Sequence, residues 1–324
     1  MSGQIFRKTR STPRCVAKGH ILLLPLMLLS SPLFAAETSW NATDWWVWPA
    51  ALFIVSFLIG IVGVLAGIGG GVLFVPIVSG FFPFHIDFVR GTGLMIALGG
   101  SLAAAPVLLE KNLASLKLAL PATLIASIFS IIGALVGLWI SAINPDYIQG
   151  GLGALILLVV LFMLRSKTQN YPKVASTDSL SQALQLNGLF FEPTHKEEIH
   201  WSAHRTKRGL LCFTAVGFLA GLFGLGAGWA NIPVLNLIMG VPIKVAVATS
   251  KFSLSIIDTT AVWVYINKGA VLPLLVVPSV VGTMLGAKIG AKLLPQMSPD
   301  LIRKLVIFVM FLAGIRSITK SFGI

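Results

Sequence analysis

The feature that most constrains this chain is a series of long apolar segments separated by short polar turns. Two of the longest, residues 118–141 and 271–294, have 24 residues each, enough for a helix to cross a bilayer core of about 30 Å. Hydrophobic residues make up 56% of the 324 residues and charged residues only 11%, whereas about 25% are charged in an average soluble protein. The sequence therefore excludes a soluble globular enzyme and predicts an all-α polytopic membrane protein.

The apolar segments form two sets of five. They lie at 47–66, 72–82, 91–109, 118–141 and 148–164, and at 210–224, 229–239, 247–266, 271–294 and 301–315. The second segment of each set has only 11 residues, so it is either a short crossing or a re-entrant segment. We therefore expect about eight to ten membrane segments, and the sequence leaves the exact count open.

The N-terminal residues 1–36 have the pattern of a secretory signal peptide. Basic residues are followed by a short apolar core at 21–29, and the small residues Ala35 and Ala36 suit cleavage before Glu37. The alternative is an uncleaved signal anchor, but nine strongly apolar residues are too few for a comfortable crossing. We expect cleavage, a first membrane repeat at 45–164 and a second at 209–324.

The polar stretch 165–208 between the repeats fixes the expected orientation. Basic residues flank it at both ends, and lysine and arginine mark cytoplasmic loops, so we expect this loop in the cytoplasm and the mature N-terminus in the periplasm of a bacterial inner membrane. The basic residues at the cytoplasmic face of the lipid bilayer then account for the formal net charge of +13. No nucleic-acid partner is predicted. Arg90 is the exception on the outer side, where it would anchor headgroups or draw anions to the outer mouth.

The two sets of segments are similar to each other. A shift of 157 positions aligns seven features of the first set with the second. The aligned pairs are Gly67 and Gly224, Gly69 and Gly226, Gly71 and Gly228, Pro76 and Pro233, Thr92 and Thr249, Pro121 and Pro278, and Gly133-Ala134 and Gly290-Ala291. We interpret the sets as two homologous helical repeats. An odd number of crossings per repeat makes them inverted, as in many secondary transporters, and an even number makes them parallel.

Each repeat contains a glycine-rich break within an apolar run that ends at a proline. The first break holds Gly69, Gly70 and Gly71, and the second holds Gly226 and Gly228. Broken backbone at membrane depth is tolerated only where it is buried in protein or lines a wet cavity. A helix that restarts after the break directs free N–H groups and its positive dipole end at that cavity, which suits an anion. The alternative interpretation is close helix packing through small residues.

The breaks and the short motifs that follow them resemble those of the TauE/SafE family of sulfite and organosulfonate exporters. The short motifs are Gly91-Thr92-Gly93 and Ala248-Thr249-Ser250, and the resemblance covers about residues 53–317 apart from the central loop. The resemblance implies an inner-membrane carrier for sulfur-containing or related small anions, with its site between the two repeats. Members differ in cargo and direction, so the resemblance fixes neither.

The second repeat departs from the family pattern in its polar residues Trp229, Asn231, Lys251 and Asp258. Lys251 and Asp258 lie seven residues apart on one helix face, about 10 Å along the axis. Ionisable groups within a span are costly, so we expect Lys251 to contact the substrate anion and Asp258 to carry a proton or act as a counter-charge. The alternatives are that Lys251 snorkels to the cytoplasmic interface and that Asp258 pairs with a neighbouring helix.

These arguments predict a secondary transporter of a small anion without catalytic, metal-binding or cofactor-binding residues. An anion channel of the same fold and a carrier for a non-sulfur carboxylate remain alternatives, and the oligomeric state is left open. His195, His200 and His204 are expected in a solvated loop, although His200 and His204 would suit a metal if that stretch were helical. The expected substrate-binding residues are Gly69, Gly70, Gly71, Thr92, Gly226, Gly228, Asn231, Thr249, Ser250, Lys251 and Asp258.

Overall fold

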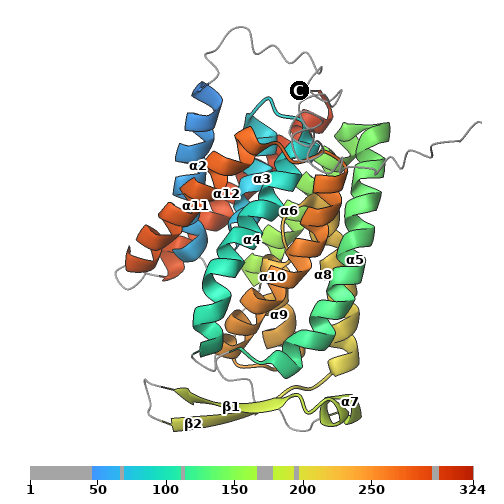
Figure 1. Ribbon diagram of the computed structural model, residues 1–324, viewed down its shortest axis with the longest axis vertical. Helices are drawn as coiled ribbons and strands as arrows, with labels where there is room; N and C mark the ends of the chain where they lie inside the picture. Colours follow the sequence, from blue (N-terminus) through green and yellow to red (C-terminus); the bar gives the residue numbers. More distant parts are fainter. Residues whose placement is uncertain are drawn as a thin grey trace, which may run out of the picture. The chain divides into compact units, whose positions relative to one another are not determined.

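The computed structural model describes residues 46–65, 69–110, 114–165, 178–192, 197–293 and 299–323 (Figure 1). The expected signal peptide, Gly67 and His195 lie outside the described residues. Within the described part, five helices are long and apolar enough to cross a membrane, namely α5, α6, α8, α10 and α11. The predicted all-α polytopic membrane fold is confirmed.

The helices follow the apolar segments closely. In the first half they are α2 (Val47–Leu65), α3 (Gly70–Phe81), α4 (Ile86–Glu110), α5 (Leu116–Ile143) and α6 (Pro145–Arg165). In the second half they are α8 (Thr206–Phe223), α9 (Gly228–Pro233), the π-helix η3 (Val234–Ile238), α10 (Ile243–Asn267), α11 (Pro273–Leu293) and α12 (Pro299–Ser321). Proline opens α6, α11 and α12, where its missing N–H costs nothing because first-turn amides have no intrahelical acceptor.

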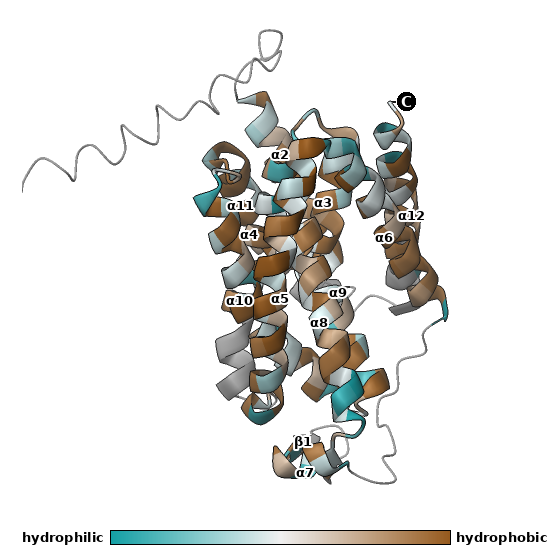
Figure 2. Cartoon of the chain, turned by 90° about the vertical axis from the view of Figure 1, so that its right-hand side faces the viewer, coloured by the Kyte–Doolittle hydropathy of each residue, from teal (hydrophilic) through white to brown (hydrophobic). Residues whose placement is uncertain are grey.

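The surface along the helices is apolar. Trp139 on α5, Leu158 on α6 and Phe308 on α12 are each at least 60% exposed. Figure 2 shows hydrophobic residues along the helices, with hydrophilic residues found mainly towards their ends. A soluble protein rarely exposes so many large apolar side chains, whereas a surface that faces lipid requires them.

The first short apolar segment forms a hairpin with the helix before it. The ring of Trp48, at the start of α2, lies 5.5 Å from the ring of Phe84 and 6.1 Å from that of Phe82, just beyond the end of α3. The chain therefore returns to the side from which α2 entered, and α2 and α3 together add no net crossing.

The second short segment forms the equivalent hairpin. At the start of α8, the backbone N–H of His204 donates to the carbonyl of Met239, just beyond η3, at 2.9 Å. A Cβ on Gly209, in the first turn of α8, would contact the Met239 side chain. The pair formed by α8 and α9–η3 therefore also returns to its starting side.

The other three helices of each half run between two opposite ends of the bundle. At one end, Gln149 near the start of α6 donates to Ser79 near the end of α3 and to Ser317 near the end of α12. At the other end, the N–H of Ser115 before α5 donates to Thr249 in the second turn of α10. Each half thus contributes one hairpin and three full-length helices.

The hairpins pack on helices of the opposite half. α2 lies against α11, and α8 lies against α5 (Figure 1). A Cβ on Gly60 of α2 would contact the carbonyl oxygen of Thr283, and one on Gly217 of α8 would contact that of Ala126. Because these neighbours are backbone atoms, the glycines allow the helix axes to come close. Both members of the second contact lie 157 residues from their counterparts in the first.

The central polar stretch contains regular structure where a solvated loop was expected. Its described part holds α7 (Ser179–Ala183) and an antiparallel hairpin of β1 (Asn187–Glu192) and β2 (Glu197–Ser202). His200 lies on β2 and His204 follows the strand, so the helical spacing considered for a metal site does not exist here. Asp178 accepts hydrogen bonds from the N–H and the hydroxyl of Thr206 and so caps α8.

Candidate functional site

The two glycine-rich breaks meet inside the protein. A Cβ on Gly71 would lie 2.5 Å from the carbonyl oxygen of Gly93 and 2.9 Å from that of Leu225 in the second break. A Cβ on Gly93 would lie 2.7 Å from the carbonyl oxygen of Gly224. Backbone carbonyls cannot move away by rotating as side chains do. Only glycine at 71 and 93 therefore lets these backbone segments come so close. The first short motif, residues 91–93, therefore packs directly on the second break.

The three candidate glycines of the first break have different surroundings. Gly71 is enclosed by backbone, and a Cβ on Gly70 would contact the side chains of Ile96 and Thr283 at 2.9 and 3.0 Å. A Cβ on Gly69 would meet nothing within 4 Å, and its φ of −64° suits any residue. Thr283 on α11 thus borders the first break, although no local pattern in the sequence singles it out.

The backbone of the second break turns at two glycines that adopt the left-handed conformation. Gly224, which ends α8, has a φ of +68°, and Gly226 has a φ of +72°. Residues with a Cβ rarely adopt this conformation, so glycine at both positions fixes the turn between α8 and α9. Gly228 follows, and a Cβ on it would lie 3.7 Å from the nitrogen of Gly69, which brings the starts of α3 and α9 close together.

Asp258 lies against the second break. The residue is fully buried, and a Cβ on Gly226 would be 3.2 and 3.4 Å from its two carboxylate oxygens. The backbone amide of Ala227 faces the carboxylate, but neither oxygen has a hydrogen-bond partner of normal geometry within the described residues. A buried carboxylate with so few partners is rare, because its desolvation is costly.

Three further residues on α9 and α10 carry buried polar atoms without a hydrogen-bond partner among the described residues. They are Trp229 and Asn231 on α9, through the indole Nε1 and both amide atoms, and Ser250 on α10, through its hydroxyl. Asn231 is fully buried and Ser250 is 1% exposed. This group offers N–H and O–H donors, which are the groups that bind an oxyanion.

Lys251 lies on α10, seven residues and about two turns from Asp258. Its side chain is partly buried, and the ion pairs found in the described part of the chain do not include it. Lys251 and Asp258 therefore share a helix face, as expected, without forming a salt bridge in this conformation. Lys251 remains available for an anion.

The two candidate threonines are engaged with backbone groups. The hydroxyl of Thr92 donates to the carbonyl of Phe88 one turn earlier on α4, at 2.7 Å. The hydroxyl of Thr249 accepts from the N–H of Ser115 and so ties α10 to the start of α5. Both side chains are fully buried, and only the Thr249 bond joins two helices.

Arg90 corrects an expectation from the sequence. We expected an arginine at the outer rim, but its side chain is fully buried. It forms an ion pair with Asp87 at 2.7 Å, donates to the carbonyls of Leu222 and Gly137, and lies over the ring of Tyr265 at 5.2 Å. Leu222 is in the last turn of α8, so the guanidinium binds a free carbonyl at the C-terminal end of that helix.

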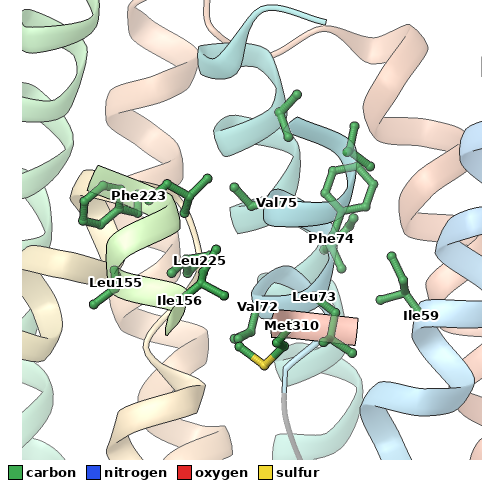
Figure 3. Close-up of a cluster of buried hydrophobic side chains, with 14 of the residues drawn as sticks. Ile59, Val72, Leu73, Phe74, Val75, Leu155, Ile156, Phe223, Leu225 and Met310 are labelled. Atoms are coloured by element: carbon green, nitrogen blue, oxygen red, sulfur yellow. The ribbon is translucent and has the colours of Figure 1, made fainter. Parts of the chain in front are cut away.

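The breaks are surrounded by apolar packing as well as polar groups. Figure 3 shows Val72 and Val75 of α3, Phe223 and Leu225 at the second break, and Ile156 of α6 in one buried cluster. The cluster joins both hairpins to α6 of the first half and, through Leu275 and Met310, to α11 and α12 of the second.

A basic cavity lies at the loop end of the bundle. It has a volume of about 520 Å³ and is lined by Asp178, Ser179, Arg205, Lys207 and Arg208. Three basic residues against one acid give this end a positive surface, which raises the local concentration of anions.

The architecture is that of a particular class of membrane protein. Paired helical breaks, buried among apolar helices and accompanied by polar groups, are characteristic of secondary transporters in membranes. Residues 52–317 match the family model described as Sulfite exporter TauE/SafE, and the chain belongs to this family. It is a multi-pass membrane transporter.

Two curated relatives are similar along much of the chain. The "Probable membrane transporter protein YunE" of Bacillus subtilis (strain 168) is 28% identical over 281 residues, covering 83% of this chain and 97% of the relative. The "Probable membrane transporter protein MJ0441" of Methanocaldococcus jannaschii is 26% identical over 204 residues, covering 61% of this chain and 65% of the relative. No solved structure matches the chain.

Proposed function

We propose that this transporter carries a small sulfur oxyanion, such as sulfite or an organosulfonate, across the bacterial inner membrane. The observation that carries the proposal is the meeting of the two breaks, where Gly71 faces Leu225. Asn231 on α9 and Ser250 on α10 add buried donors without a hydrogen-bond partner among the described residues. Lys251 supplies the positive charge, and Asp258 borders the same break. The family description supports sulfite as one candidate substrate. The anion crosses unchanged, so the proposal involves no enzymatic step.

The proposed mechanism is alternating access between two inverted repeats. The support for duplication is the recurrence of the same glycine contacts 157 residues apart, Gly60 with Thr283 and Gly217 with Ala126. Three full-length helices per half make the copies inverted. Each hairpin packs on a helix of the opposite half, so each moving body combines helices of both repeats. In this mechanism α2 moves with α11, and α8 moves with α5.

The proposed orientation places the central stretch and its basic cavity in the cytoplasm. Arg205, Lys207 and Arg208 are exposed at this end, as the preference of basic residues for the cytoplasmic side requires. The same charges would attract an anion to the inner mouth.

The experiment that tests the proposal is ligand-induced thermal stabilisation of the purified protein. The panel contains sulfite, sulfate, thiosulfate, methanesulfonate, sulfoacetate, taurine and small carboxylates. A ligand at 100 times its dissociation constant adds roughly 2.7 kcal/mol of apparent stability. We expect a sulfur oxyanion to stabilise the wild type and the control Lys288→Ala, whose lysine is exposed on α11, but not Lys251→Ala. Stabilisation by carboxylates alone would replace the sulfur anion with a carboxylate substrate.

Counterflow in proteoliposomes distinguishes a carrier from an anion channel. A carrier loaded with unlabelled anion accumulates labelled anion transiently, because each site exchanges one molecule for another. A channel of the same fold produces no such overshoot and shows unitary currents instead. A counterflow overshoot that saturates with substrate supports the carrier.

A further inference from the structure

Asp258 has surroundings that an ordinary structural carboxylate lacks. It is fully buried on α10, it lies against Gly226 of the second break, and neither oxygen accepts a hydrogen bond of normal geometry from the described residues. The site proposed above for a substrate anion lies at the same break. An anion and an ionised carboxylate at this place repel each other strongly, because little water is present to screen them.

None of the charged groups described around Asp258 forms an ion pair with it. On its own helix, Lys251 lies about two turns away and Lys244 lies near the helix start. Among the described side chains of the helices packed against α10, α4 carries Asp87 and Arg90, which pair with each other at the outer end. Lys117 of α5 bonds to Gln185 at the loop end, and Lys207 and Arg208 of α8 are exposed there. Residues 224–227 and α9 carry no ionisable side chain.

The geometry of Gly226 keeps the carboxylate accessible to the break. With a φ of +72° and no Cβ, Gly226 leaves the Asp258 oxygens in contact with the backbone that must change conformation during alternating access. At the position 157 residues earlier the chain has Ser101, which is neutral and donates to the carbonyl of Leu98 within its own helix. The acid therefore distinguishes the second break from the first.

We propose that Asp258 carries the coupling proton, so that the anion and one proton move together. The inference rests on the proposed function and identifies its coupling ion. A proton from the solution on one side binds a carboxylate oxygen and forms an O–H bond, and the neutral acid then tolerates a bound anion. After the break reopens on the other side, the anion leaves and the O–H bond releases its proton to that solution. For a monoanion the cycle moves no net charge.

The test uses full-length protein in proteoliposomes with labelled sulfate and methanesulfonate, which stay ionised from pH 5 to 8. Counterflow is measured at equal pH on both sides, and net accumulation is measured with an inward pH gradient. We expect the wild type and the control Asp146→Asn, whose exposed acid begins α6, to show both activities. Asp258→Asn should retain counterflow but lose gradient-driven accumulation at least tenfold, with an exchange rate independent of pH.

Other outcomes overturn either the inference or its basis. Gradient-driven accumulation that persists in Asp258→Asn would show that another group carries the proton. Absence of counterflow of either anion by the wild type would overturn the proposed function for these substrates and the inference with it. If Asp258→Asn does not fold, a pH dye trapped in wild-type vesicles decides the matter: one proton should enter per methanesulfonate, and influx without acidification excludes coupling.

Discussion

The guanidinium of Arg90 donates to the main-chain carbonyl of Leu222, a residue 132 positions later at the end of α8. Through this bond a side chain of the first half holds the helix that leads into the second break. Asp87 and the carbonyl of Gly137 complete its contacts, so one buried charge joins α4, α5 and α8. The second break is therefore anchored by a residue outside its own hairpin.

Arg90→Met should destabilise the protein by about 3 kcal/mol, because it leaves Asp87 and two buried carbonyls without their partner. Thermal unfolding of the detergent-solubilised protein measures the loss. Lys288→Met is the control, since Lys288 is exposed on α11. A melting temperature lowered equally in both variants would contradict the anchoring role.

Two neighbouring glycines should differ sharply in their tolerance of alanine. A Cβ on Gly71 would lie within 3 Å of two carbonyl oxygens, whereas one on Gly69 would meet nothing within 4 Å. We expect Gly71→Ala to cost about 1–3 kcal/mol of stability and to abolish counterflow, because the breaks are forced apart. Gly69→Ala should retain the wild-type melting temperature. Equal melting temperatures of the two variants would refute the close contact.

The helix positions could be predicted from the sequence because the length of an apolar run is local information. The expected segment 118–141 became α5 at Leu116–Ile143, and the breaks at Gly69–Gly71 and Gly226–Gly228 were found from glycine and proline alone. The polar residues Asn231, Lys251 and Asp258 stood out because charge and amide groups are costly in an apolar run.

The role of Arg90 could not be predicted, because the carbonyls that it binds lie 47 and 132 residues away and no local pattern connects them. The expected rim position followed from its place before an apolar run, which is also consistent with the first turns of a buried helix. The β-hairpin was missed for another reason. The stretch was expected to be a solvated loop because it is polar, whereas in β2 exposed His200 precedes buried Trp201, as in a strand with one covered face.

Sided labelling of introduced cysteines should reveal the hairpin topology. In a variant with Cys15 and Cys212 replaced by serine, we expect His85→Cys and Asp146→Cys to react from one side of the membrane and Lys207→Cys from the other. The reason is that α3 returns to the side on which α2 begins. Labelling of His85→Cys from the same side as Lys207→Cys would mean that α2 crosses alone, which the fold does not permit.

Because each hairpin packs on a helix of the opposite half, the two hairpin interfaces should respond alike to the same substitution. Gly60 packs on α11 and Gly217 on α5, each against a backbone carbonyl at the same relative position. Gly60→Ala and Gly217→Ala should therefore destabilise the protein by similar amounts, about 1–3 kcal/mol, because each methyl group separates a hairpin from its partner helix. The control is Gly100→Ala on α4, where a Cβ would meet nothing within 4 Å. If only one variant were destabilised, the two interfaces would not be equivalent, and symmetric movement of α2 with α11 and α8 with α5 would lose its support.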